Sequence, residues 1–265
     1  MITRAALRKI KRSAESSAEP SELISLVDES ARLLRPDNEA LIPWAETYAI
    51  NHRLRLARDL ELTRRYATPD AKIVEFGAAP LLLTLPLQRL GYDVTSIDID
   101  PSRFGQAIER NRLCVIKCDI EKQPLPFDVA RFDIALFNEL FEHLRIDPIF
   151  TMCEVRRVLK PGGLLLLSSP NLRSLQGLAN FLLRNRATSC AEDVYGEYEK
   201  LKTIGHMGHV REYTTREIVE FLDRVGFSVE HLVFRGNFGK SWMTRAARLI
   251  PALRPFVSYV ARARP

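Results

Sequence analysis

Residues 72–101 read KIVEFGAAPLLLTLPLQRLGYDVTSIDIDP. Two short apolar runs in this segment, 72–76 and 93–99, are rich in β-branched residues and are separated by enough residues for one helix. This pattern predicts the strand, helix and strand of a parallel α/β unit. For this segment taken alone, an ordinary strand, turn and helix without a ligand is the alternative.

A glycine ends the first run and an aspartate ends the second. Gly77 permits a tight turn and a close approach of a ligand to the backbone, because glycine has no Cβ. Asp98 lies about twenty residues further on, where a carboxylate can accept hydrogen bonds from the hydroxyls of a ribose. The two residues predict a nucleoside-type ligand at the carboxyl ends of parallel strands.

Further motifs follow in order along the chain. They read LCVIKCDI at 113–120, LPFD at 125–128, FDIALFNELFEH at 132–143 and VLKPGGLLLLSS at 158–169. Together with the glycine turn and the aspartate, they resemble the class I S-adenosylmethionine (SAM) dependent methyltransferases, over about residues 65–235. The resemblance implies an enzyme that binds SAM and releases S-adenosylhomocysteine.

The alternation of segments predicts an α/β fold with a mostly parallel sheet and helices on both faces. The resemblance implies seven strands, the last of them antiparallel. Strands are expected at 72–76, 93–98, 113–118, 132–137, 163–169, 227–234 and 256–262, and helices at 80–90, 101–111 and 147–159. Thr214 and Glu217 have capping-box spacing, which predicts a further helix ending near Val225.

Three regions are expected. Residues 1–20 form a mobile basic tail, 21–66 form helices, and 67–265 form the SAM-binding domain. The longer N-terminal helix, from about 38 to 66, is expected to be broken or bent at Pro43. An insertion after the fifth strand, 171–212, is expected to contain a helix at its start and to bind the methyl acceptor, because long loops in compact domains commonly bind ligands.

The resemblance implies a set of cofactor-binding residues. They are Glu75, Gly77, Ala78, Ala79, Asp98, Ile99, Asp119, Ile120 and Asn138. Asp98 is expected at the ribose, Gly77 with Ala78 beside the methionine part, and Asp119 with Ile120 near the adenine. The family usually has a G-x-G-x-G turn, whereas this chain has Ala79 and Pro80, which add a methyl group and remove one amide donor.

The expected reaction is O-methylation of a small molecule or glycan. His143 is the expected general base and His209 the second candidate, with Glu139 on the same helical face as His143 to orient the imidazole. A packing or capping role for His143 is the alternative. No metal is expected, because His206 and His209 lie in a loop without an evident carboxylate partner.

Composition agrees with one domain that has a sizeable core, since 46% of the 265 residues are apolar. The absence of a long apolar run or an apolar leader favours a cytoplasmic protein. The four cysteines have no CxxC or zinc spacing, and Cys114 and Cys118 are expected as buried free thiols on one strand face.

Charge is concentrated at the two ends. Residues 1–12 carry five basic side chains and 236–265 carry six, with no acidic residue in either segment. Such ends can attract a polyanion or an anionic membrane face, or are simply solvated tails, and 238–253 is the candidate segment for contact with a membrane or a partner. No specific nucleic-acid site is indicated, and the sequence assigns no oligomeric state.

Two other functional classes are open. A nicotinamide dehydrogenase is disfavoured, because the turn after the first strand has one glycine where a dinucleotide site has three. A protein of the SAM-binding fold that binds a partner without turnover is compatible with Ala79 and Pro80.

Overall fold

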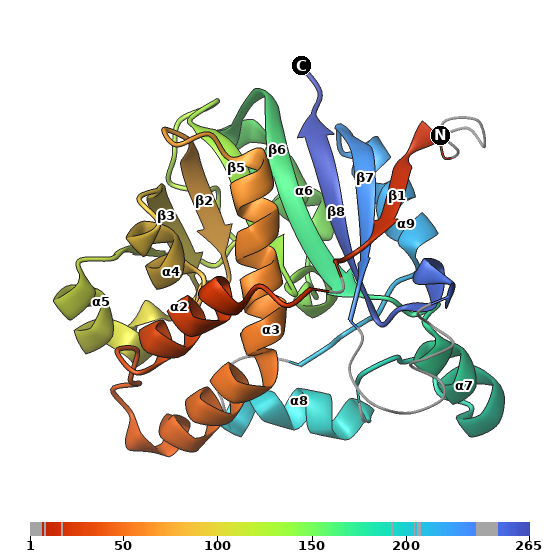
Figure 1. The fold of residues 1–265 in the computed structure, drawn as a ribbon, viewed down its shortest axis with the longest axis horizontal. Coiled ribbons are helices and arrows are strands. Elements are labelled where there is room, and N and C mark those ends of the chain that lie inside the picture. Colours follow the sequence, from red (N-terminus) through yellow and green to blue (C-terminus); the bar gives the residue numbers. More distant parts are fainter. Residues whose placement is uncertain are drawn as a thin grey trace. The chain divides into compact units, whose positions relative to one another are not determined.

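The structure is a computed structural model that describes residues 7, 9–16, 18–191, 193–203, 205, 208–236 and 249–265. Its strands form an eight-stranded mixed sheet in the order β1-β7-β8-β6-β5-β2-β3-β4, with helices around it (Figure 1). The expected α/β class is confirmed, and the sheet has one strand more than expected. The chain divides into two compact units.

One unit contains Ser17–Leu136 and Arg157–Gly163. Its strands are β2 (Lys72–Phe76), β3 (Asp93–Asp98), β4 (Cys114–Lys117) and most of β5 (Phe132–Asn138). They pair in parallel, β2 between β3 and β5, and β4 outside β3. Apolar side chains of β2 and β3 are almost fully buried, as expected for strands covered on both faces.

The helices of this unit are α2 (Ser21–Ala31), α3 (Ile42–Tyr66), α4 (Thr84–Arg89) and α5 (Gly105–Asn111), with short 3-10 turns η1 (Glu39–Leu41) and η2 (Pro101–Phe104). The helix expected from about 38 to 66, broken or bent at Pro43, is divided into η1 and α3, and Pro43 occupies the first turn of α3, where its missing N–H costs nothing. The helix expected at 80–90 begins only at Thr84. Pro86 therefore also lies in a first turn.

The other unit contains Met1–Ser16, Phe137–Arg156 and Leu164–Pro265. It holds β1 (Lys11–Ala14), most of β6 (Leu159–Pro170), β7 (Phe227–Arg235) and β8 (Phe256–Ala263). Its helices are α6 (Pro148–Val158, mostly in this unit), α7 (Leu175–Arg184), α8 (Val194–Thr203) and α9 (Thr215–Arg224), with η3 (Phe141–His143) and η4 (Pro251–Leu253). As expected, β8 is antiparallel to its neighbours β6 and β7.

The eighth strand comes from the segment expected to be a mobile tail. Lys11–Ala14 pair in parallel with His231–Phe234 of β7 and form the edge of the sheet. The four residues of this strand, KRSA, show no alternation of apolar and polar side chains. The strand therefore could not be predicted from the sequence and is recognised only by its backbone pairing with β7.

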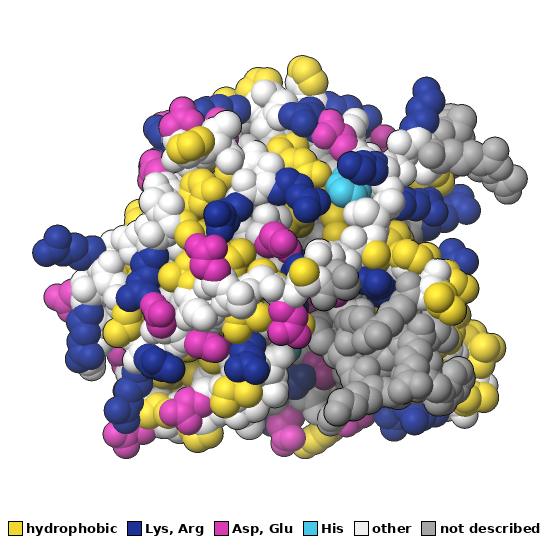
Figure 2. Space-filling view, in the orientation of Figure 1, with side chains coloured by type: hydrophobic (Ala, Val, Ile, Leu, Met, Phe, Trp, Pro, Cys, Tyr) yellow, Lys and Arg dark blue, Asp and Glu magenta, His cyan; other side chains and the backbone are white. Residues whose placement is uncertain are grey.

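The insertion 171–212 has more regular structure than expected. Besides α7 it contains α8, which was not predicted, and the capping box of Thr214 and Glu217 begins α9 as expected. Figure 2 shows hydrophobic side chains over α7, where Phe181, Leu182 and Leu183 are exposed.

Two further features bear on expectations from the sequence. Cys114 is exposed and Cys118 is buried one residue beyond β4, so the two thiols do not form a buried pair on one strand face. In the part of the chain that the structure describes, no helix is long and apolar enough to cross a membrane. The candidate membrane segment 238–253 lies largely outside the described residues.

Candidate active site

The turn after β2 and the end of β3 are joined by hydrogen bonds. Gly77 has a φ of 68°, and the Gly77 and Ala78 amides donate to the Ile97 carbonyl at 2.9 and 3.1 Å. The Ala79 amide donates to Oδ2 of Asp98 at 2.9 Å. The structure therefore brings together the glycine turn and the carboxylate that the sequence assigned to one ligand.

Asp98 is a buried carboxylate with several donors around it. Its Oδ1 accepts from the Asp100 amide at 2.9 Å and from the Arg103 guanidinium at 3.0 Å, and the residue is 5% exposed. A carboxylate has about four lone-pair positions, so these bonds and that from Ala79 leave Oδ2 able to accept one more donor. This lone pair is the acceptor that a hydroxyl donor requires.

Glu75 lies beneath the turn and does not face an open site. It is 5% exposed, and its Oε2 accepts from the hydroxyls of Thr84 at 2.5 Å and Ser96 at 3.0 Å. Burial raises the pKa of Glu75 to about 7, although these two hydrogen bonds act in the opposite direction. Through these two hydrogen bonds, Glu75 of β2 connects β2 to the start of α4 and to β3, so it supports the turn that follows β2.

The remaining cofactor candidates lie at strand ends. The Cys118 amide donates to the Asp98 carbonyl at 2.9 Å, which places Asp119 next to the end of β3. Asp119 pairs with Lys122 at 2.9 Å. Ile99, the residue after β3, is 44% exposed. In the other unit, Asn138 is the last residue of β5.

The helix expected to carry Glu139 and His143 on one face is absent. Glu139 has a φ of 49°, and only η3 follows it. The Glu139 amide donates to the Ser168 carbonyl at 2.9 Å, and the Ser168 hydroxyl donates to Oε1 of Glu139 at 2.8 Å. The expected helix is therefore wrong, because the left-handed residue Glu139 interrupts it, and the Glu139 carboxylate accepts from Ser168 of β6.

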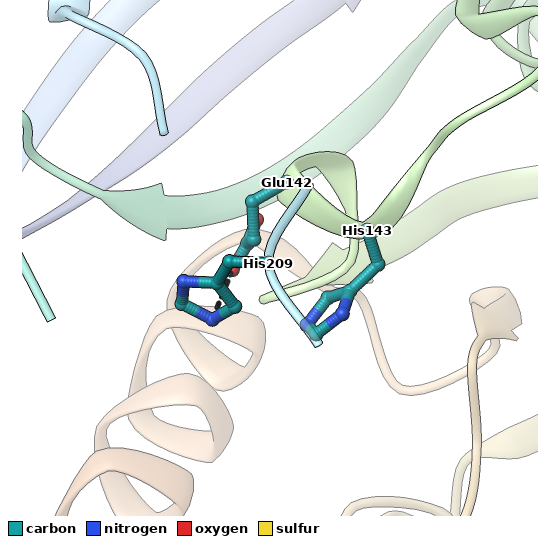
Figure 3. Close-up of side chains that lie close together, drawn as sticks. All are labelled: Glu142, His143 and His209. Carbon is teal, nitrogen blue, oxygen red and sulfur yellow. Dashed lines mark ion pairs between the residues drawn. The ribbon is translucent and has the colours of Figure 1, made fainter. Parts of the chain in front are cut away.

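A different carboxylate, Glu142, lies beside the histidines (Figure 3). Its Oε1 is 4.0 Å from Nε2 of His209, and its side chain is 0% exposed. The rings of His143 and His209 meet edge to face with centroids 4.9 Å apart. Nδ1 of His143 lies 3.0 Å from the Gly208 carbonyl oxygen, and Nδ1 of His209 lies 3.2 Å from Oε1 of Glu212. Both sequence-predicted histidines thus share one cluster.

Backbone hydrogen bonds hold this cluster together. The Val210 and Arg211 amides donate to the Glu142 carbonyl at 2.8 and 3.3 Å. The His209 amide donates to Oε2 of Glu197 in α8 at 2.7 Å. The segment that carries His209 is therefore fixed both to η3 and to α8.

The carboxylates of the cluster change the basicity of His209. Burial, the largest effect, lowers the pKa of His209, but its hydrogen bond to Glu212 and the nearby charges of Glu142, Glu212 and Glu139 outweigh burial and raise the pKa above its usual value. For Glu212, burial acts to raise the pKa, but hydrogen bonds from His209 and Ser189 contribute to lowering it to about 2. His209 therefore lies next to a carboxylate that is charged at neutral pH.

Sequence reasoning missed Glu142 and Glu212. A signal for both was present, because Glu142 directly precedes His143, and Glu212 follows His209 by three residues. His206, the other half of the histidine pair seen in the sequence, lies outside the described residues.

A family model described as a methyltransferase domain matches residues 74–167, which include the glycine turn, Asp98 and the cluster residues Glu142 and His143. The fold described above and this sequence match both indicate a methyltransferase. Residues 74–167 carry a methyltransferase domain, and the chain has the fold of SAM-dependent methyltransferases. SAM is the cofactor of this family, and the glycine turn with Asp98 fits it.

Solved structures share the fold of this methyltransferase at low sequence identity. A SAM-dependent methyltransferase from Thermotoga maritima has a TM-score of 0.56 and 18% identity, covering 84% of this chain and 97% of its own. One from Methanosarcina mazei has a TM-score of 0.55 and 20% identity, covering 77% and 97%. These similarities establish the fold.

Curated relatives of the methyltransferase are named ubiquinone biosynthesis O-methyltransferase. That of Cereibacter sphaeroides (strain ATCC 17025) is 27% identical over 167 residues, 60% of this chain and 67% of the relative. That of Xanthomonas campestris pv. campestris (strain B100) is 31% identical over 124 residues, 45% of this chain and 52% of the relative. The chain matches between about half and two thirds of the length of these relatives.

Proposed function

We propose that this methyltransferase transfers the methyl group of SAM to a hydroxyl oxygen of a small molecule or glycan. The cluster of Glu142, His143 and His209 carries the proposal, because transfer to a neutral hydroxyl requires a group that takes its proton. The names of the curated relatives, which are O-methyltransferases, favour the same reaction.

SAM supplies a sulfonium-bound methyl group that is transferred by in-line displacement. The task of the chain is to hold the cofactor and an acceptor oxygen in line, because orientation supplies much of the acceleration in such a reaction. Gly77, Ala78 and Ala79 would line the methionine part, Asp98 would accept a ribose hydroxyl through Oδ2, and Asp119 with Ile120 would lie near the adenine.

The tautomers of both histidines suit a base. A backbone carbonyl only accepts hydrogen bonds, so Nδ1 of His143, 3.0 Å from the Gly208 oxygen, carries the proton when the ring is neutral. Nδ1 of His209 faces the Glu212 carboxylate in the same way. In both neutral rings Nε2 then bears the lone pair. His143 is the proposed base and His209 the second candidate.

Acceptor selection is assigned to the insertion 171–212. This segment carries His209 and also exposes apolar side chains on two helices, among them Phe181 on α7 and Tyr195 on α8, which are 60% and 74% exposed. Exposed apolar patches on soluble proteins commonly mark binding surfaces. An acceptor with an apolar part is therefore favoured.

A labelled-methyl assay tests the proposal. The protein is incubated with methyl-labelled SAM and a panel of phenols, sugars and lipids, while calorimetry measures SAM binding separately. Label on an acceptor oxygen is the expected result. SAM binding without any labelled acceptor would favour a SAM-binding protein without turnover, and label on nitrogen would contradict O-methylation.

A further inference from the structure

We propose that Glu142, His143 and His209 bind one divalent transition-metal ion of the zinc type. Each residue offers one ligand atom, and these three atoms lie within 4.8 Å of one another. Bonds of about 2.0–2.2 Å bring the ligands of a tetrahedral zinc site to roughly 3.3–3.5 Å from each other. The distances between ligand atoms therefore need to shorten by at most about 1.5 Å around an ion.

The second contact of each histidine is the one that metal-binding histidines make. A histidine that ligates a metal almost always donates its other ring N–H to a carboxylate or a backbone carbonyl, which fixes the tautomer and the ring orientation. His143 has Nδ1 at 3.0 Å from the Gly208 carbonyl oxygen, and His209 has Nδ1 at 3.2 Å from the Glu212 carboxylate. Both Nε2 atoms are thereby presented as ligands.

The chemical types of the three ligands indicate which kind of ion binds. Two imidazoles and one carboxylate form the ligand set of open catalytic zinc sites and of non-haem iron sites. Magnesium and calcium prefer oxygen ligands alone. The side chains of Glu142 and Glu212 are both 0% exposed, and a cation between them and the imidazoles offsets their buried charge.

A second group, Cys190 with His209 and Glu212, has similar spacing. It is the weaker candidate for two reasons. Nδ1 of His209, which faces Cys190 at 3.9 Å, already lies against Glu212. A metal-bound cysteine must also be a thiolate, whereas here the Cys190 thiol donates to Oε1 of Glu212 at 3.4 Å.

Three ligands leave room in the coordination shell for a water molecule or a substrate oxygen. A metal ion lowers the pKa of a bound hydroxyl or water, so the ion would take over from imidazole the role of making the acceptor oxygen reactive, with the proton leaving to solvent. This consequence rests on the proposed function, whereas metal binding itself does not.

Zinc titration of the chelator-stripped full chain tests the site. Calorimetry and equilibrium dialysis with Zn²⁺ alone should give one ion per chain, with no displacement by millimolar Mg²⁺. Glu142→Gln and His143→Gln should each lose more than about 100-fold in zinc affinity, and Glu212→Gln about 10–100-fold, as for a group behind a ligand. The matched control Cys190→Ser should bind zinc like the wild type.

Cobalt adds a spectroscopic readout. Co²⁺ bound by imidazole and carboxylate should show visible d–d absorption without the near-ultraviolet thiolate band that Cys190 would produce. Unchanged SAM affinity in each variant shows that it is folded. Zinc affinity that is unaffected by Glu142→Gln, or abolished by Cys190→Ser, overturns the assignment.

The two proposals fail separately. Methyl transfer that persists in a chain unable to bind zinc overturns the metal site and leaves O-methylation standing. Zinc bound at the assigned residues in a chain that labels no acceptor supports the metal site and contradicts the proposed function.

Discussion

Replacement of Glu75 by glutamine should make the protein more stable at neutral and alkaline pH. Burial raises the pKa of Glu75 from its ordinary 4.5 to about 7 in the folded chain. Below pH 4.5 both the folded and the unfolded states hold the proton, and the pKa difference has no effect. As the pH rises from about 4.5 to 7, the unfolded state releases the proton first, so the free energy of unfolding falls and then stays at its lower value.

The size of this effect follows from the two pKa values. At about 1.36 kcal/mol per pH unit, the interval between 4.5 and about 7 corresponds to roughly 3 kcal/mol. Glutamine resembles the protonated acid and keeps an oxygen that accepts from Thr84 or Ser96. The advantage of Glu75→Gln over the wild type should therefore grow from near zero at pH 4.5 to at most ~3 kcal/mol at pH 8.

Urea unfolding at pH 4.5, 6, 7 and 8 measures this difference. Glu46→Gln, at an exposed position on α3, is the matched control and should differ from the wild type by less than about 0.5 kcal/mol at every pH. A stability difference for Glu75→Gln that does not change with pH would refute the reasoning, because it would mean that Glu75 titrates alike in both states.

Three further predictions concern the site. Asp98→Ala should weaken SAM binding in calorimetry by roughly 1.5–3 kcal/mol, the value of a charged hydrogen bond; unchanged affinity would remove Asp98 from the cofactor site. His143→Ala should lower turnover about 10²–10⁴-fold with little change in SAM affinity, and near wild-type turnover would exclude His143. The double variant Tyr195→Ala and Tyr198→Ala should raise KM for the acceptor and leave SAM affinity unchanged, whereas an unchanged KM would place the acceptor elsewhere.

The parallel strands of the first unit could be predicted because the residues that specify them are close together in the sequence. Alternation of apolar runs, the glycine at 77 and the aspartate at 98 lie within one strand-helix-strand segment, and the structure joins them by the Ala79 hydrogen bond. The capping box of Thr214 and Glu217 is equally local. Such features depend on neighbouring residues and leave a direct trace in the sequence.

The histidine cluster was only half predictable because its contacts are distant in sequence. His143 and His209 were both identified, but their carboxylate partners depend on how the chain folds after β5. Glu139 adopts a left-handed conformation, which ends the strand without starting a helix. Besides Glu212, which is close in sequence, His209 lies near Glu142, and the Val210 amide that donates to the Glu142 carbonyl fixes this second approach. No periodicity in the sequence encodes that contact.

The pairing of β1 with β7 has a consequence for solubility. Strand edges with unpaired amides and carbonyls are templates for aggregation, and proteins commonly protect them with short, charged strands. Lys11–Ala14 fulfil this role for β7, and the Glu15 amide extends the protection by donating to the Phe234 carbonyl at 3.0 Å. A chain shortened to begin at Ser21 would leave the edge of β7 uncovered and available to a strand from a second molecule.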